Sequence, residues 1–473
     1  TVPVYKKVLA DLLTPISAYM RLEKKSDYAF ILESVDKGTQ YGRYSFIGRN
    51  PNLIVRSNQM ATQILEDGSW RNKPKEFLTF LRDIQKKYQG PKLSGMPNFT
   101  GGLVGFMGYE SIIWSEDIPI HDKDTLQCPD ALFMLFHELI AFDHLKNQII
   151  LFSNVQVEEE INLREAYHDA YAFIDQMGED LHTDIDYETP ISKQQSKLNS
   201  NFTKETFEDA VVKAQEHIKA GDVFQLVLSQ RFHRKTSADP LILYRALRSI
   251  NPSPYMFHLH MGDFDVIGAS PELLVKVEDN EIEIRPIAGT RKRGNDAAED
   301  ARLADDLLKD KKERAEHLML VDLGRNDVGK AAAFGSVHVK EFMVVEYYSH
   351  VMHIVSDVRG RLRDDKNIFD ALCSGFPAGT LTGAPKIRAM EIINDLEPNR
   401  RGVYAGAIGY FDFTGDMNTC IAIRTMVIKD NIVYFQSGAG IVYDSDPKKE
   451  FEETVNKAKA INSAIDLAEN GLV

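Results

Sequence analysis

The sequence predicts an α+β protein with two lobes, and three observations support this prediction. The chain has 473 residues, which is more than one domain usually contains. Some segments carry apolar residues at helical spacing, whereas others alternate or run apolar as strands do. Residues 178–201 are polar and have few large apolar side chains, as linkers do. We therefore expect an N-terminal lobe over residues 1–177, a polar linker over 178–201 and a C-terminal lobe over 202–473.

The N-terminal lobe is predicted to consist mainly of strands. We expect strands over residues 28–34, 42–48, 131–143 and 148–157, and helices that begin near residues 77 and 159. The stretch 99–110 is rich in glycine but does not match the G-x-G-x-x-G pattern of a phosphate-binding loop. We interpret it as closely packed backbone where a strand meets a helix.

The C-terminal lobe is predicted to open with a helix. Thr203 is a suitable N-cap for this helix, and Gly221 is suited to the position just after its last turn. A strand over residues 222–232 follows, and its alternation allows Gln225 to point into a cleft. Later strands are expected over residues 403–413, 420–429 and 431–438.

The last long helix of the chain carries a stripe of charged side chains beside its apolar face. Glu450, Glu453 and Lys457 form this stripe because they recur at helical spacing. A second predicted helix carries Glu313 and Glu316, which are also three residues apart. Two such pairs can supply carboxylate oxygens to one hard cation such as Mg²⁺. The alternative is a solvated helix edge on which Lys457 relieves the repulsion around Glu453.

The composition argues against nucleic-acid-binding and membrane-spanning proteins. The chain has 70 acidic and 56 basic residues and a net charge of -14, which disfavours a general nucleic-acid binder. No apolar run approaches the ~20 residues of a membrane span, and residues 1–7 lack the apolar block of a signal peptide. Cys128, Cys373 and Cys420 are scattered and form no metal-binding or disulfide pattern. We therefore expect a protein of the reducing cytoplasm.

Four further stretches carry specific motifs. They are residues 268–274 (GASPELL), 285–291 (RPIAGTR), 376–386 (FPAGTLTGAPK), and the group 404–410 (YAGAIGY), 422–424 (AIR) and 438–441 (GAGI). With the two glutamate-bearing helices they resemble the chorismate-utilising enzymes, motif after motif and in the same order, over residues 202–466. This family includes anthranilate synthase component I, aminodeoxychorismate synthase, and the isochorismate and salicylate synthases. The resemblance implies interleaved lobes with antiparallel sheets packed face to face, helices outside, and the active site in the C-terminal lobe.

Within the family, the sequence is most similar to anthranilate synthase component I. Ala288 stands where aminodeoxychorismate synthases carry a nucleophilic lysine, and Gln225 stands where water-adding members carry a lysine base. Residues 32–34 and 251–256 match the pocket through which tryptophan inhibits this enzyme. The resemblance implies a Mg²⁺-dependent conversion of chorismate and ammonia to anthranilate and pyruvate, the first committed step of tryptophan biosynthesis. The alternatives are aminodeoxychorismate synthesis and an inactive tryptophan-binding regulator. A nucleotide enzyme is disfavoured because residues 379–386 lack the Lys-Ser/Thr of a P-loop.

The resemblance also implies catalytic roles. Glu272 would be the acid that protonates the departing C4 hydroxyl, which requires a raised pKa. His353 would contact the ring or serve the elimination of pyruvate, although a histidine in an apolar strand can simply be a core residue. Thr290 and Thr380 match hydroxyls that contact the ligand, and either can instead be a turn residue. The implied catalytic set is Glu272, His353, Lys457, Gln225 and Thr380.

Ligand-binding residues follow from the same motif match. Glu316 and Glu453 would hold Mg²⁺ against the ring carboxylate. Glu313 and Glu450 would lie behind them and hold the waters of the metal. Arg424 would bind the pyruvyl carboxylate, since guanidinium groups bind carboxylates through two hydrogen bonds, although it can also be a surface charge. The implied substrate-binding set is Ala288, Gly289, Thr290, Tyr404, Arg424, Gly438, Ala439 and Gly440.

A tryptophan site between the lobes is implied as well, with Glu33 and Arg43 as further candidates. Residues 32–34 by themselves are an ordinary strand, and residues 251–256 by themselves are an ordinary proline-rich turn. Their occurrence together favours the pocket. The implied tryptophan-binding set is Ser34, Pro254, Tyr255, Met256, Ile408, Gly409, Tyr410, Gly415 and Cys420.

The source of ammonia points to a partner. None of the three cysteines lies in the glycine-flanked nucleophile turn of a glutaminase. The resemblance therefore implies a separate glutamine amidotransferase subunit, anthranilate synthase component II, which joins this chain in a heterotetramer. No nucleic-acid or membrane partner is expected.

Overall fold

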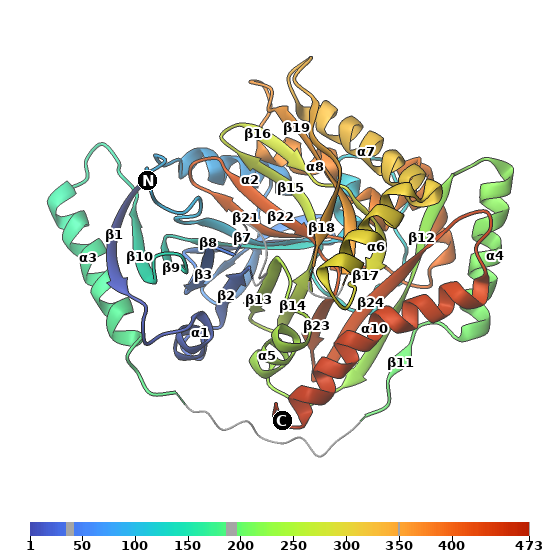
Figure 1. Cartoon of the computed structure of the whole chain (residues 1–473). Helices are drawn as coiled ribbons and strands as arrows, with labels where there is room; N and C mark the ends of the chain where they lie inside the picture. The colour runs from blue at the N-terminus through green and yellow to red at the C-terminus, as the bar shows by residue number, and fades with distance from the viewer. Residues whose placement is uncertain (35–41, 186–195, 349–350, 473) are drawn as a thin grey trace.

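Two antiparallel β-sheets dominate the computed structural model, which describes residues 1–34, 42–185, 196–348 and 351–472 (Figure 1). The first sheet has the spatial order β1 (Val2–Leu9), β10 (Gln148–Val155), β9 (Glu138–Asp143), β3 (Tyr44–Arg49), β2 (Tyr28–Glu33), β13 (Tyr255–Met261), β14 (Phe264–Ser270), β23 (Thr425–Lys429), β24 (Ile432–Ile441), β12 (Gln225–Lys235) and β11 (Asn199–Ser200), and β20 (Gly383–Ala384) also pairs with β12.

The second sheet lies against the first. Its spatial order is β17 (Ile287–Lys292), β19 (Val351–Arg361), β16 (Glu281–Ile284), β15 (Leu273–Glu278), β22 (Met417–Ile421), β21 (Ala407–Asp412), β7 (Gly102–Met107), β8 (Ala131–Phe136), β4 (Leu53–Asn58), β5 (Ala61–Glu66) and β6 (Ser69–Asn72), and β18 (His338–Tyr347) also pairs with β19.

A shared apolar core joins the two sheets. Phe30 of β2 and Leu259 of β13 come from the first sheet, and Phe106 of β7 and Phe136 of β8 come from the second. The rings of Phe30 and Phe136 meet edge to face, with their centroids 4.8 Å apart. Fully burying side chains of this size stabilises the fold by about 1.5–3 kcal/mol each. The predicted α+β fold with antiparallel sheets packed face to face is confirmed.

Helices cover the outer faces of both sheets. The first sheet is covered by α1 (Pro15–Glu23), α3 (Leu163–Asp180), α5 (Pro240–Ile250) and α10 (Pro447–Glu469). The second is covered by α2 (Phe77–Lys87), the 3₁₀ helix η1 (Tyr109–Trp114), α6 (Ala297–Lys309), α7 (Lys311–Ala331) and α8 (Ile368–Gly375). Near β12 lie α4 (Lys204–Ala220), the 3₁₀ helix η2 (Gly379–Leu381) and α9 (Lys386–Leu396). No helix in the described part of the chain has the length and apolarity that a membrane crossing requires.

Both sheets combine strands from the two sides of residues 178–201. In the first sheet β2 pairs with β13, and in the second β7 pairs with β21. The expected linker is also shorter than its sequence suggested, because α3 continues to Asp180 and Asn199–Ser200 form β11. Residues 186–195 of the linker lie outside the described residues. The lobes are therefore interleaved, and the division of the chain at this segment stays a prediction.

The glycine-rich stretch forms β7 and leads into η1. A Cβ atom on Gly105 would lie 2.0 Å from the carbonyl oxygen of Leu132, and one on Gly409 would lie 2.0 Å from that of Asn418. Only glycine fits at such distances. The interpretation of this stretch as closely packed backbone, rather than a phosphate-binding loop, agrees with this geometry.

Local signals set the ends of α4. The Thr203 hydroxyl accepts a hydrogen bond from the backbone N–H of Thr206, as an N-cap does. Gly221 follows the last turn with a φ of 84°, a left-handed conformation that glycine adopts without steric penalty. Both predictions for this helix are confirmed.

Candidate active site

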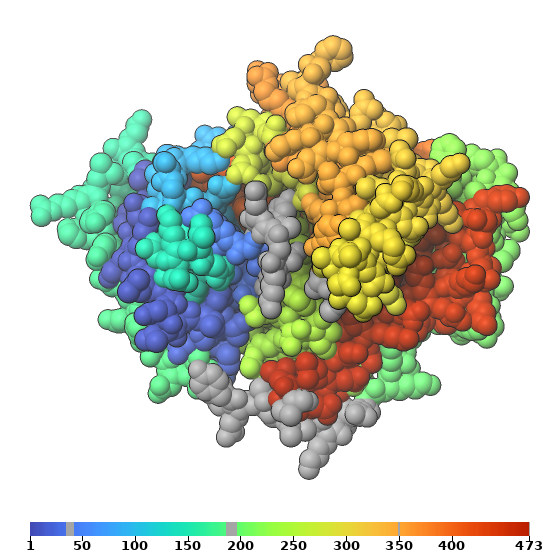
Figure 2. All heavy atoms as spheres, in the orientation of Figure 1, coloured from blue at the N-terminus to red at the C-terminus, as the bar shows by residue number. Residues whose placement is uncertain are grey.

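Two helices present carboxylates toward one another. The capping residue Asp310 starts α7, whose first turns carry Glu313 and Glu316. Partial loss of hydration raises the pKa of Glu316, and the charges of Glu313 and Glu453 raise it further. Because Glu453 lies on α10, the two helices lie close enough for the charge of one to act on a carboxyl group of the other. Figure 2 shows the yellow and orange atoms of α6 and α7 beside the red atoms of α10 on one face of the molecule.

Glu450 and Lys457 complete the charged stripe of α10. Loss of hydration raises the pKa of Glu450, and the nearby charge of Glu453 raises it further. The Lys457 ammonium lies 2.7 Å from Glu453 Oε1 and donates to the carbonyl oxygen of Gly438 at 3.0 Å. Lys457 therefore relieves the repulsion around Glu453, as the alternative interpretation expected, and also connects α10 to the glycine-bearing strand β24.

The predicted motif residues of β17 lie beside Glu313 and His353. Gly289 has a φ of 69°, and a Cβ atom there would lie 3.2 Å from Glu313 Oε2. Its carbonyl oxygen lies 3.0 Å from His353 Nδ1, and the Thr290 hydroxyl lies 3.1 Å from the same nitrogen. Burial lowers the pKa of His353. The neutral imidazole thus donates through Nδ1–H to Gly289 and keeps a lone pair on Nε2.

Glu272 lies just before β15 and holds its carboxyl group against Thr380. The Thr380 hydroxyl donates to Glu272 Oε1 at 3.0 Å. Loss of hydration raises the pKa of Glu272 to about 7, although the Thr380 hydrogen bond and the Arg424 charge oppose this rise. Both residues line one pocket, together with Arg285 of the RPIAGTR motif. The sequence-based requirement of a raised pKa is thus met by the structure.

Arg424 lies near both Glu272 and His353. Its side chain is exposed, and its charge acts on the pKa of both Glu272 and His353. Its guanidinium lies 3.4 Å from the side-chain oxygen of Asn251. Arg424 has no carboxylate ion pair among the described residues. It therefore suits an anionic ligand better than an internal partner.

The glycine strand closes the other side of the site. Gly438 and Gly440 of β24 pair with Ser229 and Val227 of β12. No atom of the described residues lies within 4 Å of a Cβ position on Gly440, which is itself exposed. Gly438 leaves room for the Tyr404 hydroxyl, which a Cβ atom would meet at 3.0 Å.

Three predicted residues lie at the margins of this arrangement. Gln225 is buried at the start of β12 and pairs with Ala384. Ala288 pairs with Ile354 of β19, and Ala439 is fully buried between its glycine neighbours. Their roles toward a ligand stay predictions.

Comparison with known proteins identifies the family. A family model described as chorismate binding enzyme matches residues 27–463. The chain belongs to the chorismate-binding enzymes. This confirms the resemblance found in the motifs.

Relatives of this chorismate-binding enzyme match along nearly its whole length. Anthranilate synthase component 1 of Acetivibrio thermocellus is 46% identical over 476 residues, which cover 99% of this chain and 96% of the relative. The Aquifex aeolicus protein of the same name is 45% identical, with 99% and 95% covered. The crystal structure of anthranilate synthase component I from Streptococcus pneumoniae has a TM-score of 0.80 at 37% identity, covering 96% of this chain and 99% of that one. The menaquinone-specific isochorismate synthase of Escherichia coli shares the fold, with a TM-score of 0.74 at 17% identity over 98% and 94% of the chains.

Four of the residues predicted to bind tryptophan in this chorismate-binding enzyme lie between the sheets. Ile408, Cys420, Tyr255 and Tyr410 belong to or pack against the same apolar cluster. Ile408 pairs with Cys420 across β21 and β22. The Ser34 hydroxyl is buried and has no hydrogen-bond partner among the described residues.

The other predicted tryptophan residues are placed in different ways. Met256 is buried in β13, and Pro254 lies just before this strand. Gly409 lies on β21 between Ile408 and Tyr410, which belong to or pack against the apolar cluster between the sheets. Gly415 instead lies in the turn between β21 and β22, and none of the described residues comes within 4 Å of its Cβ position.

Glu33 and Arg43 have partners of their own. Glu33 accepts hydrogen bonds from the Tyr244 hydroxyl at 2.6 Å and from Arg248 at 2.9 Å. Arg43 forms a bidentate ion pair with Asp143. These contacts account for both side chains without a ligand. Sequence reasoning missed Asn418, which lies opposite Tyr410. Its side-chain oxygen is buried and has no hydrogen-bond partner in the described part of the chain.

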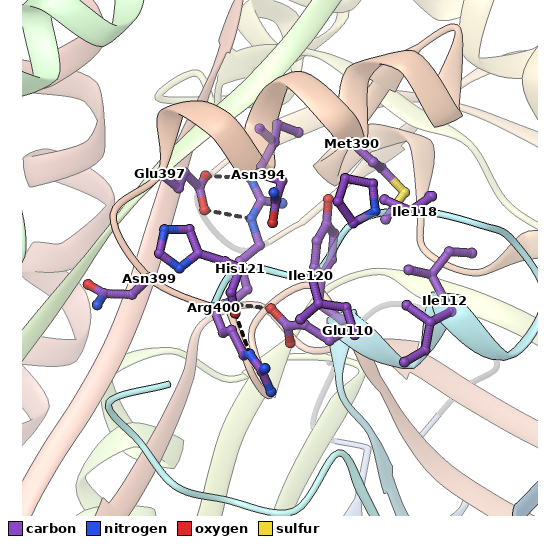
Figure 3. Close-up of a pocket in the computed structure, with 15 residues that line it drawn as sticks. Glu110, Ile112, Ile118, Ile120, His121, Met390, Asn394, Glu397, Asn399 and Arg400 are labelled. Atoms are coloured by element: carbon purple, nitrogen blue, oxygen red, sulfur yellow. Dashed lines mark hydrogen bonds and ion pairs between the residues drawn. The ribbon is translucent and has the colours of Figure 1, made fainter. Parts of the chain in front are cut away.

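A second pocket lies outside the predicted site. Figure 3 shows it between η1, the segment that follows η1, and α9, with Ile112, Ile118 and Met390 on its apolar wall. Glu110 accepts backbone hydrogen bonds at its edge, from Arg401 at 2.6 Å and from the next residue at 3.0 Å. Burial raises the pKa of Glu110 to about 7. No sequence motif indicated this pocket.

One further cluster holds metal-ligating side chains. His258, His260 and Asp265 place their ligand atoms within 4.8 Å of one another. Both imidazoles lie 2.8 Å from the same oxygen of Asp265. These hydrogen bonds account for the proximity of the three groups, which lie on the hairpin of β13 and β14 rather than beside the facing glutamates.

Proposed function

We propose that this chain converts chorismate and ammonia to anthranilate and pyruvate, as the chorismate-binding component of an anthranilate synthase. The observation that carries the proposal is Glu272, a carboxyl group with a raised pKa, held by Thr380 in a site that also contains facing glutamates and Arg424. Full-length similarity to proteins named anthranilate synthase component 1 supports the same activity.

The first chemical step requires an acid, because a hydroxyl leaves poorly. Protonated Glu272 gives its proton to the C4 hydroxyl, which departs as water while the ammonia nitrogen bonds to C2. Gln225 suits ammonia as nucleophile, since a neutral amide is a poor base for activating water. Arg424 and Tyr404 hold the pyruvyl carboxylate.

The second step removes pyruvate and makes the ring aromatic. A proton leaves C2 while the C3–oxygen bond breaks, and the enolpyruvyl group departs as the enolate of pyruvate, which takes up a proton to become pyruvate. His353 suits this proton transfer because Nδ1–H is fixed on Gly289 and Nε2 keeps its lone pair. Lys457 supplies a fixed positive charge beside β24.

The two glutamate pairs fit a hard divalent cation. Their oxygen donors lie on α7 and α10, and the charge of Glu453 acts on Glu316. Lys457 forms its ion pair with Glu453. We propose Glu316 and Glu453 as direct Mg²⁺ ligands. Glu313 and Glu450 would hold the waters of the metal. When bound, Mg²⁺ neutralises the ring carboxylate of the substrate.

The pH dependence of kcat/KM should report Glu272. The acid form exists below its pKa, which is about 7. Activity should therefore fall as the pH rises through about 7, because the carboxylate can no longer donate a proton. Rates of anthranilate formation at saturating ammonia and limiting chorismate check this. Thr380→Val removes the hydrogen bond that lowers this pKa, so the fall should move to higher pH. A flat profile across this range would contradict the assignment of Glu272.

Tryptophan should inhibit the enzyme through the residues between the sheets. Ser34→Leu replaces a buried hydroxyl, which has no partner among the residues that the structure describes, with a larger apolar side chain. The tryptophan concentration for half-inhibition should therefore rise by about 10-fold or more. Turnover without tryptophan should change far less. Ser69→Leu, on the exposed strand β6, is the matched control. Equal inhibition of both variants would place the effector elsewhere.

We further propose that a glutamine amidotransferase subunit supplies the ammonia, in a heterotetramer, and that the reaction takes place in the cytoplasm. The name component 1 of the relatives supports a second component, and the three cysteines are free thiols, as in reducing compartments. The chain alone should use ammonium salts but not glutamine. Glutamine-dependent activity of the purified chain would refute the need for this partner.

The decisive assay combines chorismate, ammonium and Mg²⁺ and follows anthranilate fluorescence. Fluorescence that requires Mg²⁺ supports the proposal. Consumption of chorismate without anthranilate would indicate aminodeoxychorismate synthesis, and no consumption would indicate a regulatory binding protein.

A further inference from the structure

A buried ion pair lies behind the site, and no step of the proposed reaction uses it. Glu397 caps the C-terminal end of α9, and Arg401 follows four residues later. The Arg401 and Glu397 side chains are 1% and 4% exposed, and Arg401 Nη2 lies 2.6 Å from Glu397 Oε1. Arg401 Nε donates to the second carboxylate oxygen at 2.9 Å. The pair is therefore bidentate and excluded from solvent.

Each partner of this pair also holds two backbone or hydroxyl groups. Arg401 Nη1 donates to the carbonyl oxygen of Leu381 at 2.7 Å, and Nη2 donates to that of Val227 at 2.8 Å. Glu397 Oε1 accepts from the backbone N–H of Ser229 at 2.8 Å and from its hydroxyl at 2.7 Å. One ion pair thus ties η2, β12 and the end of α9 together.

The groups that the pair holds adjoin the proposed site. The first held carbonyl belongs to the residue after Thr380, which donates to Glu272. The two held residues of β12 pair across the sheet with Gly440 and Gly438. The Arg401 guanidinium also lies 5.6 Å from the centre of the Tyr404 ring. Thr380, Tyr404 and the glycine strand β24 therefore all adjoin groups that this one ion pair holds.

We infer that Arg401 and Glu397 are positioning residues, which hold Thr380, Tyr404 and the glycine strand in one fixed arrangement. The inference rests on the proposed function. A guanidinium has a rigid planar fork of donors, whereas a lysine ammonium cannot reach four acceptors in this geometry. A buried ion pair often stabilises a fold no better than apolar residues of the same volume. The contacts of this ion pair with three parts of the site thus indicate that it fixes their positions rather than stabilising the fold.

The test compares Arg401→Lys with a control of equal burial. Arg401→Lys should lower kcat by about 10²-fold, because misplacing reacting groups by about 1 Å has an effect of this size. KM for chorismate should change much less. The control is Arg234→Lys, which alters another buried ion pair of β12, with Glu469, whose side chains are 4% and 2% exposed. It should lose similar thermal stability and keep near wild-type kcat. Glu397→Gln, which keeps the side-chain shape, provides a second variant should Arg401→Lys not fold.

The pH profile separates positioning from a general loss of packing. Displacing Thr380 weakens its hydrogen bond to Glu272, so the pKa of Glu272 rises and the fall of kcat/KM moves to higher pH. The Arg424 charge also acts on Glu272, and none of these variants replaces Arg424. Adding Arg401→Lys to Thr380→Val should then produce no further pH shift, because both changes remove the same contact.

The outcomes are distinguishable. A wild-type pH profile in folded Arg401→Lys and Glu397→Gln, or an equal loss of kcat in Arg234→Lys, would overturn the inference. Failure of the unaltered chain to form anthranilate would contradict the proposed function instead.

Discussion

Glu272→Gln is expected to lower kcat by about 10³-fold, within the range that general acids contribute. Glutamine keeps the shape of the side chain and can still meet the Thr380 hydroxyl, so the fold should remain intact. It has no acidic proton to give to the C4 hydroxyl. Anthranilate fluorescence at saturating chorismate, ammonium and Mg²⁺ measures the loss, and thermal melting checks the fold.

A matched control for this substitution lies on the strand that follows Glu272. Glu278→Gln changes a carboxylate at the end of β15 that pairs with Lys276 outside the site. This control should keep its turnover and its fall in activity as the pH rises through about 7. The residual activity of Glu272→Gln should lose that fall, because the titrating group is gone. Turnover within tenfold of wild type in Glu272→Gln would remove Glu272 as the acid.

Glu453→Gln is expected to abolish turnover nearly completely, because it removes a proposed Mg²⁺ ligand. Glu453 is about half exposed, and its ion pair with Lys457 lies on the same helix. Surface pairs of this kind contribute about 0–1 kcal/mol, so the melting temperature should hardly change. Calorimetric titration with Mg²⁺ should show weaker binding, which provides a measurement independent of activity.

Glu452→Gln is the control for the metal assignment. Glu452 is the adjacent residue of α10 and is exposed, but it does not belong to the charged stripe. Its replacement should leave both Mg²⁺ binding and turnover unchanged. Retained activity in Glu453→Gln, or equal weakening of Mg²⁺ binding in both variants, would refute the metal site.

Local physical signals allowed much of the architecture to be predicted. Thr203 and Gly221 mark the two ends of α4 as expected, since helix capping depends only on the neighbouring backbone. The charged stripe of α10 followed from helical spacing alone. That a charge of α10 acts on a carboxyl group of α7 could not be derived from spacing, because the two helices are far apart in the sequence; the motif resemblance supplied this expectation.

The ion pair of Arg401 and Glu397 could not be predicted from the sequence. Arg401 donates hydrogen bonds to the carbonyl oxygens of Val227 and Leu381. None of these three residues lies in a sequence pattern that indicates the other two. A buried arginine also contradicts the usual preference for solvent, so composition favours a surface position. The length of the linker was overestimated for a related reason, since polar residues at the end of α3 are equally compatible with an exposed helix.

The pairing of β7 with β21 has a consequence for how the chain reaches its native state. Gly105 pairs with Gly409, and β2 likewise finds its neighbour β13 only after a long intervening stretch. Pairings between such distant segments form slowly, because loop closure must precede the contact. During synthesis the early strands therefore emerge long before their neighbours, with open hydrogen-bonding edges and an apolar face exposed. Such edges favour aggregation, so productive folding should depend on shielding the early strands until the last strands have left the ribosome.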